Sequence, residues 1–452
     1  MRNKRTSAFA LKTARAILIC AAALQLPPQL ACAQSPSQTS SKQAGANQTA
    51  QAASEAQPLN DAPLVNPTRA LRHYDITPAS LPPPNSSPDA TNGPDVIARP
   101  KGAQLQMPPG FAINTFAEGG FRRARWMALA PNGDVFVADA DADSIIILRG
   151  MKEDGTARER FTFATGLNKP FGMAFWRDYF YVGNTNAVVR FRYKAGQTKA
   201  DGEPEKIADI PGQGYREHWT RNIVFNPEGT KMYVTIGSQS NVSEEPEPRA
   251  SILEFNPDGT GRRIYASGTR NPIGLDFNPS TKVLWAAVQE RDRLGDELVP
   301  DYVTPIKESG FYGWPYAYLG QNIDPRRKGE RPDLVKRTIV PDVLIQAHSA
   351  VLGLAFYRGT MFPQEYRGDA FVALHGSWNR TKRTGYKIIR IRFKDGRAVG
   401  GYDDFLTGWM LDENSTQVWG RPVGLLVLKD GSMLITDDGA DKIWRVTYTG
   451  KS

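Results

Sequence analysis

One histidine in this chain stands in a setting suited to proton transfer. The 452 residues contain only four histidines, and His218 lies in the stretch REHWTRN, between a carboxylate and an arginine and just ahead of the apolar run IVF. Imidazole is the side chain whose ordinary pKa best suits general-base chemistry near neutral pH. A polar packing residue is the alternative, so the role of His218 depends on where the fold places it.

A second candidate for chemistry is the segment QERDRLGDEL at residues 289–298. It offers carboxylate and carbonyl oxygens but no sulfur or imidazole, which suits Ca²⁺ better than Zn²⁺. Glu290 is the first carboxylate of this candidate metal site, and an acidic surface loop is the alternative interpretation. The stretch DADADS is not an EF-hand, because Ser144 and Gly150 stand where that loop needs Gly and Glu.

The elements that must position these residues form a repeat. Six segments share a small residue, an apolar triplet, a turn and a second apolar strand, and the turns PNG, NPEG and KDG are hairpin signals. The last apolar residues of the first strands are Leu129, Phe175, Phe225, Phe277, Phe356 and Val427. Sheets of four strands repeated at roughly 40–60 residues are typical of a β-propeller.

The repeat therefore predicts an all-β fold, a six-bladed β-propeller of four-stranded antiparallel blades. The fourth and fifth intervals between the aligned residues are longer, 79 and 71 residues. They predict loop insertions around residues 291–345 and 358–420. A β-sandwich is the alternative, but one sandwich rarely needs about 350 residues.

The propeller predicts which side chains meet at the central channel, because the residues just before each innermost strand gather around the axis. The positions six and seven before each aligned residue are Arg122 and Arg123, Asn168 and Lys169, His218 and Trp219, Arg270 and Asn271, Ser349 and Ala350, and Gly420 and Arg421. Five of these six pairs contain a basic side chain or an imidazole. Like charges repel unless an anion lies among them, and guanidinium groups suit carboxylates, so the pattern predicts a pocket for a small polyanion.

The N-terminus has the pattern of an export signal. A basic stretch, the apolar run AILICAAALQL and the sequence ACAQ predict a signal peptide over residues 1–33, and hence a periplasmic or secreted protein. Lipid anchoring through Cys32 is a minor alternative, since Gln29 stands where a lipobox usually has Leu. No later apolar run approaches the ~20 residues of a membrane span, so we expect a soluble protein without a transmembrane segment.

Removing residues 1–33 changes the composition. Five basic residues leave, which lowers the net charge from +9 to +4, too little to indicate a nucleic-acid or membrane partner. Both cysteines leave as well, so we expect no disulfide and no thiolate metal site. Residues 34–105 are rich in Gln, Ser and Ala and then in Pro, and predict a disordered tether. The propeller is expected to occupy residues 106–452.

From about residue 107 to the C-terminus, an ordered series of motifs carries a family resemblance. The motifs are HWTRNIVFNPEGTKMYVTIGSQSN, SGTRNPIGLDFNP, ERDRLGDEL, GFYGWPY, AHSAVLGLAFY, HGSWNR and GRPVG. Together they resemble the soluble pyrroloquinoline-quinone (PQQ) sugar dehydrogenases, most closely the aldose sugar or L-sorbosone dehydrogenase branch. The resemblance implies a six-bladed propeller that holds PQQ over the channel together with a Ca²⁺ ion.

The resemblance also implies roles for individual residues. His218 matches the catalytic base, and Arg270 and Asn271 match a pair that contacts the quinone, with Arg270 stabilising negative charge on the reduced cofactor. Arg421 matches a ligand of the cofactor carboxylates. The backbone carbonyls of Arg291 and Asp292 match a calcium-binding dipeptide that is Gly-Pro in the glucose-oxidising branch, so the chain departs from the family there.

Three further residues are candidates for cofactor contact. Lys169 belongs to the cationic positions around the axis, and Asn379 or Arg380 of HGSWNR takes the place of a family lysine. His348 and His375 also follow predicted strands, where they either line a substrate pocket or bond to loop backbone. His73 is expected to lie outside the propeller.

The implied activity is oxidation of an aldose or a sugar aldehyde by hydride transfer to Ca²⁺-bound PQQ. The sequence indicates neither the electron acceptor nor the oligomeric state. A calcium-dependent lactonase or esterase on a six-bladed propeller is one alternative, but it needs a central cage of Asp, Glu and Asn. A non-enzymatic recognition propeller is the other, and it does not require a charged axis.

Overall fold

The computed structural model describes residues 64–67, 71–212 and 218–450, and every structural statement below concerns these residues. They belong to a unit that runs from Pro58 to Ser452. The predicted signal peptide, Cys32 and the first part of the predicted tether lie outside the described residues, as do the two residues ahead of His218.

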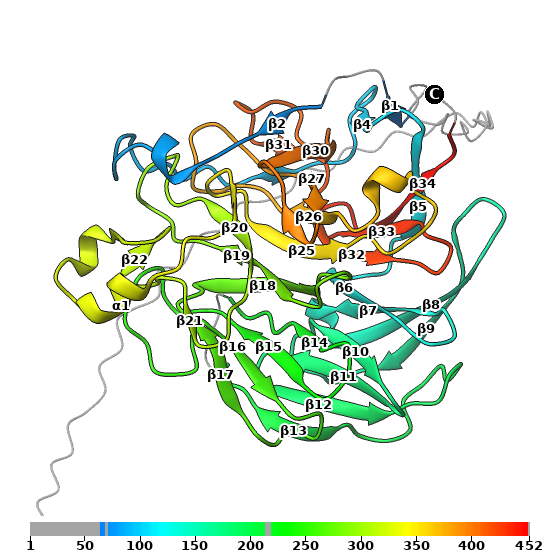
Figure 1. The fold of residues 1–452 in the computed structure, drawn as a ribbon. Coiled ribbons are helices and arrows are strands. Elements are labelled where there is room, and N and C mark those ends of the chain that lie inside the picture. Colours follow the sequence, from blue (N-terminus) through cyan, green and yellow to red (C-terminus); the bar gives the residue numbers. More distant parts are fainter. Residues whose placement is uncertain (1–63, 68–70, 213–217, 451–452) are drawn as a thin grey trace, which may run out of the picture. The chain divides into compact units, whose positions relative to one another are not determined.

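Six antiparallel sheets make up the fold (Figure 1). Blade one is β6 (Ala124–Leu129), β7 (Val135–Asp139), β8 (Ser144–Met151) and β9 (Ala157–Ala164). Blade two is β10 (Met173–Trp176), β11 (Tyr179–Asn184), β12 (Ala187–Arg192) and β13 (Glu205–Asp209). Blade three is β14 (Ile223–Phe225), β15 (Met232–Ile236), β16 (Ser251–Phe255) and β17 (Arg263–Ser267), with β21 (Gly310–Phe311) added in parallel.

The other three blades follow the same order. Blade four is β18 (Asn271–Phe277), β19 (Leu284–Gln289), β20 (Asp301–Pro305) and β24 (Val343–Ile345). Blade five is β25 (Val351–Phe356), β26 (Ala370–Leu374), β27 (Lys387–Ile391) and β30 (Tyr402–Leu406), with β2 (His73–Tyr74) at its outer edge. Blade six is β32 (Pro422–Val427), β33 (Met433–Asp437), β34 (Lys442–Tyr448) and, from the start of the domain, β5 (Phe111–Glu118).

The six-bladed propeller is confirmed. The innermost strands β6, β10, β14, β18, β25 and β32 contact one another in that order and close the ring. Five of the six aligned residues end an innermost strand, and Phe175 stands one residue before the end of β10. The pairing of β5 with β34 joins the two ends of the domain inside one blade, which closes the ring with backbone hydrogen bonds.

Short elements lie outside this pattern, several of them in the predicted insertions. They are β1 (Val65–Asn66) with β4 (Leu105–Gln106), β3 (Asp95–Val96) with β31 (Gln417–Val418), β22 (Ala317–Tyr318) with β23 (Asn322–Ile323), β28 (Phe393–Lys394) with β29 (Arg397–Ala398), the helix α1 (Pro332–Arg337) and four 3-10 turns at Pro78–Ser80, Ala140–Ala142, Pro325–Arg327 and Gln364–Tyr366. None of the helices in the described ranges is long and apolar enough to cross a membrane.

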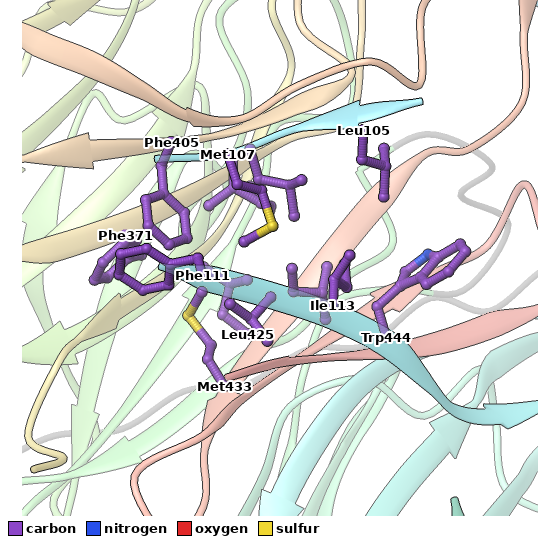
Figure 2. Packing of buried hydrophobic residues seen from close by; sticks show 14 of the residues in the cluster. Leu105, Met107, Phe111, Ile113, Phe371, Phe405, Leu425, Met433 and Trp444 are labelled. Atoms are coloured by element: carbon purple, nitrogen blue, oxygen red, sulfur yellow. The ribbon is translucent and has the colours of Figure 1, made fainter. Parts of the chain in front are cut away.

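Apolar side chains fill the space between neighbouring blades. Between blades five and six, Phe111 packs edge-on against Phe362 and Phe405, with ring centroids 4.8 and 5.0 Å apart. Figure 2 shows this cluster, in which Leu105 and Met107 join the blade residues. Edge-to-face aromatic pairs stabilise such a core beyond the area they bury.

The structure differs from the sequence prediction over residues 71–105, which composition assigned to a tether. Strand β2 extends blade five, where Tyr74 stacks on Tyr402 with centroids 4.8 Å apart. His73, expected outside the propeller, donates a 2.7 Å hydrogen bond from its Nδ1 to the Asp403 carboxylate. The proline-rich composition favours an extended backbone, and an extended backbone is what the open edge of a sheet can pair with.

Candidate functional site

The starts of the innermost strands bring the main predicted residues to one end of the channel. Asn271 begins β18 and Arg270 precedes it, Arg421 directly precedes β32, and His218 lies five residues before β14. His218 and Asn271 share one small space beside Gly237. A Cβ atom on Gly237 would lie 2.5 Å from both the His218 Cβ and the Asn271 Oδ1, so only glycine leaves room for both side chains.

His218 is held as a neutral imidazole. Its Nδ1 lies 3.0 Å from the Ser238 carbonyl oxygen and 3.0 Å from the Ser238 hydroxyl, which itself donates to the Ser240 carbonyl. A carbonyl only accepts, so Nδ1 carries the proton and the lone pair lies on Nε2. Burial, and then the nearby charge of Arg270, lower the pKa of His218 to about 3. Nε2 is therefore a proton acceptor at neutral pH.

Arg270 is fixed by the segment 289–298 that the sequence singled out. Its guanidinium donates to the Glu290 carbonyl at 2.6 Å and to the Asp292 carboxylate at 3.1 Å. Asn241, which sequence reasoning missed, accepts from Arg270 and from the Asp292 backbone N–H, and donates to the Asp292 carbonyl at 2.9 Å. Asn241 thus locks the arginine and the predicted metal dipeptide into one arrangement.

His348 lies on the other side of Asp292. Its Nε2 is 2.9 Å from the Gly295 carbonyl, and its Nδ1 is 3.4 Å from an Asp292 carboxylate oxygen. Burial opposes the charged form, but Asp292 and the Gly295 carbonyl prevail and raise the pKa of His348. The structure therefore places His348 behind the predicted metal dipeptide as a second partner of Asp292.

The side chains of the other two residues predicted at the metal, Glu290 and Arg291, point into the protein interior. The Arg291 side chain is buried and pairs with Asp324 at 3.2 Å, so only its backbone carbonyl is left to act as a ligand. The Glu290 carboxyl accepts from the Arg291 N–H, and burial raises the pKa of this carboxyl to about 8. In the ranges described, no group of three or more His, Cys, Asp or Glu residues gathers around one point, so a metal here depends on backbone oxygens.

A buried aspartate organises the opposite rim. Asp438 accepts hydrogen bonds from Arg123 at 3.2 Å, from Arg125 at 2.5 Å and from the His375 ring at 2.8 Å. Arg421 donates to the His375 Nδ1 at 3.0 Å. A guanidinium only donates, so this nitrogen must accept and His375 carries its proton on Nε2. Burial, followed by the charge of Arg421, accordingly lowers the pKa of His375 to about 3.

Lys169 completes the rim beside Trp219. Its ammonium pairs with Asp141 at 2.9 Å, and the same carboxylate lies 3.5 Å from Arg123. Lys169, Arg123 and Arg125 stand 5.4, 6.0 and 5.7 Å from the centre of the Trp219 ring, within reach of cation–π attraction. The sequence predicted a ring of cations; the structure corrects this to a mixed ring, in which carboxylates alternate with the cations.

Asn379 and Arg380 are tied to neighbouring loops rather than to the rim. The Asn379 amide accepts from the Arg293 N–H and donates to the Ala90 carbonyl. Arg380 donates to the Asp296 carbonyl and to the Glu297 carboxylate. Both side chains therefore hold the segment 289–298 against the loop after β26.

The neutral state of His375 has a consequence for stability. The unfolded chain takes up a proton near pH 6.5 and the folded chain only near pH 3, so stability is lost as the pH falls through this interval. We expect a loss on the order of 2 kcal/mol from this residue between pH 6.5 and pH 5. His375→Gln, which keeps one donor and one acceptor, should flatten the fall of the unfolding temperature over this range; equal slopes for the two proteins would contradict it.

Comparisons with known proteins identify the family to which this fold and site belong. The family model described as glucose / sorbosone dehydrogenase matches residues 175–382, and a model described as TrAA12-like matches residues 324–449. A Borreliella burgdorferi protein of uncharacterised function is 31% identical over 356 residues, which covers 76% of this chain and 91% of that protein. The chain belongs to the glucose/sorbosone dehydrogenase family.

Other proteins similar to this glucose/sorbosone dehydrogenase family member have named activities or ligands. Aldose sugar dehydrogenase YliI of Escherichia coli is 35% identical over 214 residues, 42% of this chain and 55% of that enzyme. The calcium structure of a Trichoderma reesei family AA12 enzyme has a TM-score of 0.68 at 17% identity, over 79% of this chain and 99% of that one. The PQQ-bound aldose sugar dehydrogenase of Streptomyces coelicolor has a TM-score of 0.54 at 19% identity, over 75% and 99%. At these identities the two structures support the fold alone.

Proposed function

We propose that the protein is a quinoprotein dehydrogenase that oxidises an aldose or a sugar aldehyde, with PQQ and Ca²⁺ as cofactors. The observation that carries the proposal is the pairing of a neutral, partly buried His218 with the fixed guanidinium of Arg270 at one end of the channel. A base and a cation side by side are what removal of a hydroxyl proton, with stabilisation of the resulting negative charge, requires. An L-sorbosone-like aldehyde is one candidate substrate.

The residues present fit an anionic cofactor. Among the described residues, the Nε atoms of Arg125 and Arg421 are buried donors without a hydrogen-bond partner, and Asn271 Oδ1 is a buried acceptor without one. Buried polar atoms are rarely left unsatisfied, so a group bearing carboxylates and carbonyls suits the two arginine donors. The Asn271 oxygen would instead accept from an N–H or O–H of the ligand. Arg421, Arg270, Asn271 and Lys169 would hold PQQ.

Calcium would rest on the backbone carbonyls of Arg291 and Asp292, since Ca²⁺ accepts oxygen ligands of this kind. PQQ, when bound, supplies the hydride acceptor and Ca²⁺ polarises it as a Lewis acid. The protein supplies the rest: His218 Nε2 takes the hydroxyl proton, and Arg270 stabilises the negative charge that develops. Asp292 and Asn241 keep Arg270 in place through the contacts described above.

The same proposal covers the location of the protein. The signal-peptide pattern at residues 1–33 supports export, and a periplasmic or secreted enzyme would pass electrons to an acceptor that the sequence does not identify. Expression of the full chain followed by N-terminal sequencing of the exported form tests this, with cleavage after Ala33 as the expected result.

Reconstitution tests the cofactors. Purified protein should reduce an artificial dye with aldoses only after PQQ and Ca²⁺ are added, and a calcium chelator should reduce the rate to background. Calcium, but not magnesium, should restore activity, because Mg²⁺ demands a tighter octahedral arrangement than two carbonyls in one loop provide. Absence of both a cofactor spectrum and dye reduction would contradict the proposal.

A further inference from the structure

A large cavity lies away from the channel axis, on the outer side of blade five. Its volume is about 610 Å³, within the range of about 300–1,000 Å³ typical of small-molecule sites. One wall comes from residues 71–106, and the other comes from the loops at 380–387 and 407–414. The cavity therefore exists because the N-terminal segment folds back onto blade five.

Most side chains that line the cavity are polar, and its buried charged groups already have partners. Arg383 donates to the Ser377 and Ser415 carbonyls and to the Asn92 amide oxygen, and the other buried charges form ion pairs. Lys387 and Asp404, with side chains 8% and 9% exposed, form an ion pair at 2.6 Å. Lys387 also donates to the Tyr74 hydroxyl at 3.1 Å. At the rim, Lys382 pairs with Glu413 at 2.7 Å. An anionic ligand would have to separate such pairs, which disfavours it.

Two amide side chains add hydrogen-bonding capacity that the protein does not use. Gln346 accepts from the Thr384 hydroxyl through its Oε1, and Gln106 accepts from the Thr407 hydroxyl through its Oε1. In each case the amide oxygen is fixed, so the NH₂ group is oriented, and no hydrogen bond from either NH₂ occurs in the described part of the chain. Both residues line the cavity. Their NH₂ groups are hydrogen-bond donors in the same cavity as the paired Asp404 carboxylate and Lys387 ammonium.

The chemistry that fits this lining is that of a neutral, polyhydroxylated molecule. Each hydroxyl both donates and accepts, so it can bond to the amide NH₂ groups, to a carboxylate oxygen and to an ammonium without disturbing the ion pair. Met410 supplies apolar surface for the carbon-bound hydrogens of a sugar ring. A purely apolar ligand would leave the buried polar groups desolvated and unpaired.

One loop connects the cavity to the candidate catalytic site. Tyr386 lines the cavity, and its ring packs on the backbone of Gly376, where an added Cβ would lie only 2.1 Å from the ring. Gly376 follows His375, which bonds to Asp438 and Arg421 on the channel rim. The loop at 375–387 thus has one end on the channel rim and the other in the cavity wall.

We propose that this cavity is a saccharide-binding site, separate from the site of oxidation, that holds a neutral sugar through Gln106, Gln346 and the Lys387–Asp404 pair. The site goes beyond the proposed dehydrogenase activity, because its lining alone indicates the ligand class. It would retain a second sugar or a remote ring of a longer saccharide.

The test is calorimetric titration of the protein without added cofactor with glucose, maltose and maltotriose, and with citrate as an anionic probe. We expect a neutral sugar to bind and the double variant Gln106→Leu/Gln346→Leu to weaken it about tenfold, as loss of two hydrogen bonds implies. Gln364→Leu, the same exchange at an exposed turn, should change nothing. Leu411→Trp, which narrows the rim without removing a hydrogen bond, should weaken binding as well.

Three results would overturn the proposal: no neutral sugar binds, citrate binds more tightly than any sugar, or sugar binding is lost with Arg270→Ala but kept in the glutamine variants. The last result would assign the binding to the catalytic site. Since no cofactor is added and no turnover is measured, failure here leaves the dehydrogenase proposal standing. A lack of dye reduction would equally leave this binding result intact.

Discussion

Replacing His218 by glutamine is expected to lower the rate of dye reduction about 10²–10⁴-fold, the usual contribution of a positioned general base. The imidazole is neutral and partly buried, with its lone pair on Nε2 because Nδ1 donates to the Ser238 carbonyl. Glutamine can repeat the hydrogen bond to Ser238 but cannot take a proton. Steady-state kinetics on the reconstituted enzyme should show the loss in kcat rather than in KM.

The control for this variant is binding of the cofactor. PQQ affinity, measured by fluorescence titration, should change little, since the cations proposed to bind PQQ are untouched in His218→Gln. His73→Gln, which alters an imidazole on the outer edge of blade five, should keep full activity. If His218→Gln kept wild-type kcat, His218 would not be the base.

The pH profile provides an independent check on the same residue. Because the pKa of His218 is lowered to about 3, the base remains deprotonated throughout the mildly acidic range. The acid limb of kcat/KM should therefore fall well below the ordinary histidine pKa of about 6.5. A limb near 6.5 would contradict the lowered pKa of the base in the free enzyme.

Much of the propeller could be predicted from the sequence because each blade repeats the same local pattern. The turn signals and apolar runs located the ends of the innermost strands, and a fixed offset from them brought His218, Arg270 and Arg421 to one end of the channel. The offset works because every blade has the same strand order. A residue at a fixed distance before the end of its innermost strand therefore lies at the same end of the channel in every blade.

What the sequence could not predict depends on contacts between blades. Asp437 and Asp438 are adjacent and identical in type, yet Asp437 accepts from the Arg421 N–H and the Trp444 ring while Asp438 turns to Arg125. The repeat pattern of the sequence cannot predict that these two adjacent aspartates have different partners. Asn241 likewise has no local signature, because its partners Arg270 and Asp292 lie 29 and 51 residues away.

The N-terminal segment shows a different limit. Its proline-rich composition contains no helix or strand pattern, and composition alone therefore indicated a tether. Its order comes from partners elsewhere: Leu105 and Met107 are fully buried against blades five and six, and β2 pairs with the outer strand β30 (Figure 1). Burial of a few apolar residues and the use of an open sheet edge are properties of the whole fold.

The second large effect is expected at Asp438, where Asp438→Asn should lower the free energy of unfolding by about 3–5 kcal/mol. The carboxylate is 2% exposed and joins three blades, because Arg125 belongs to blade one, His375 follows the second strand of blade five, and Asp438 itself follows β33 of blade six. Burial already lowers the pKa of Arg125 to about 10 even though Asp438 opposes the shift. Loss of the negative charge would leave this guanidinium buried without its counter-ion.

Thermal unfolding of the cofactor-free protein measures this effect, with Asp333→Asn at the exposed Arg331–Asp333 pair as the control that should barely change the unfolding temperature. The same cations are proposed to meet the carboxylates of PQQ, so added PQQ should raise the unfolding temperature of Asp438→Asn more than that of the wild-type protein. An Asp438→Asn protein as stable as its control would mean that Arg125 does not need the carboxylate. The mixed ring of carboxylates and cations would then contribute little to the junction of blades five, six and one.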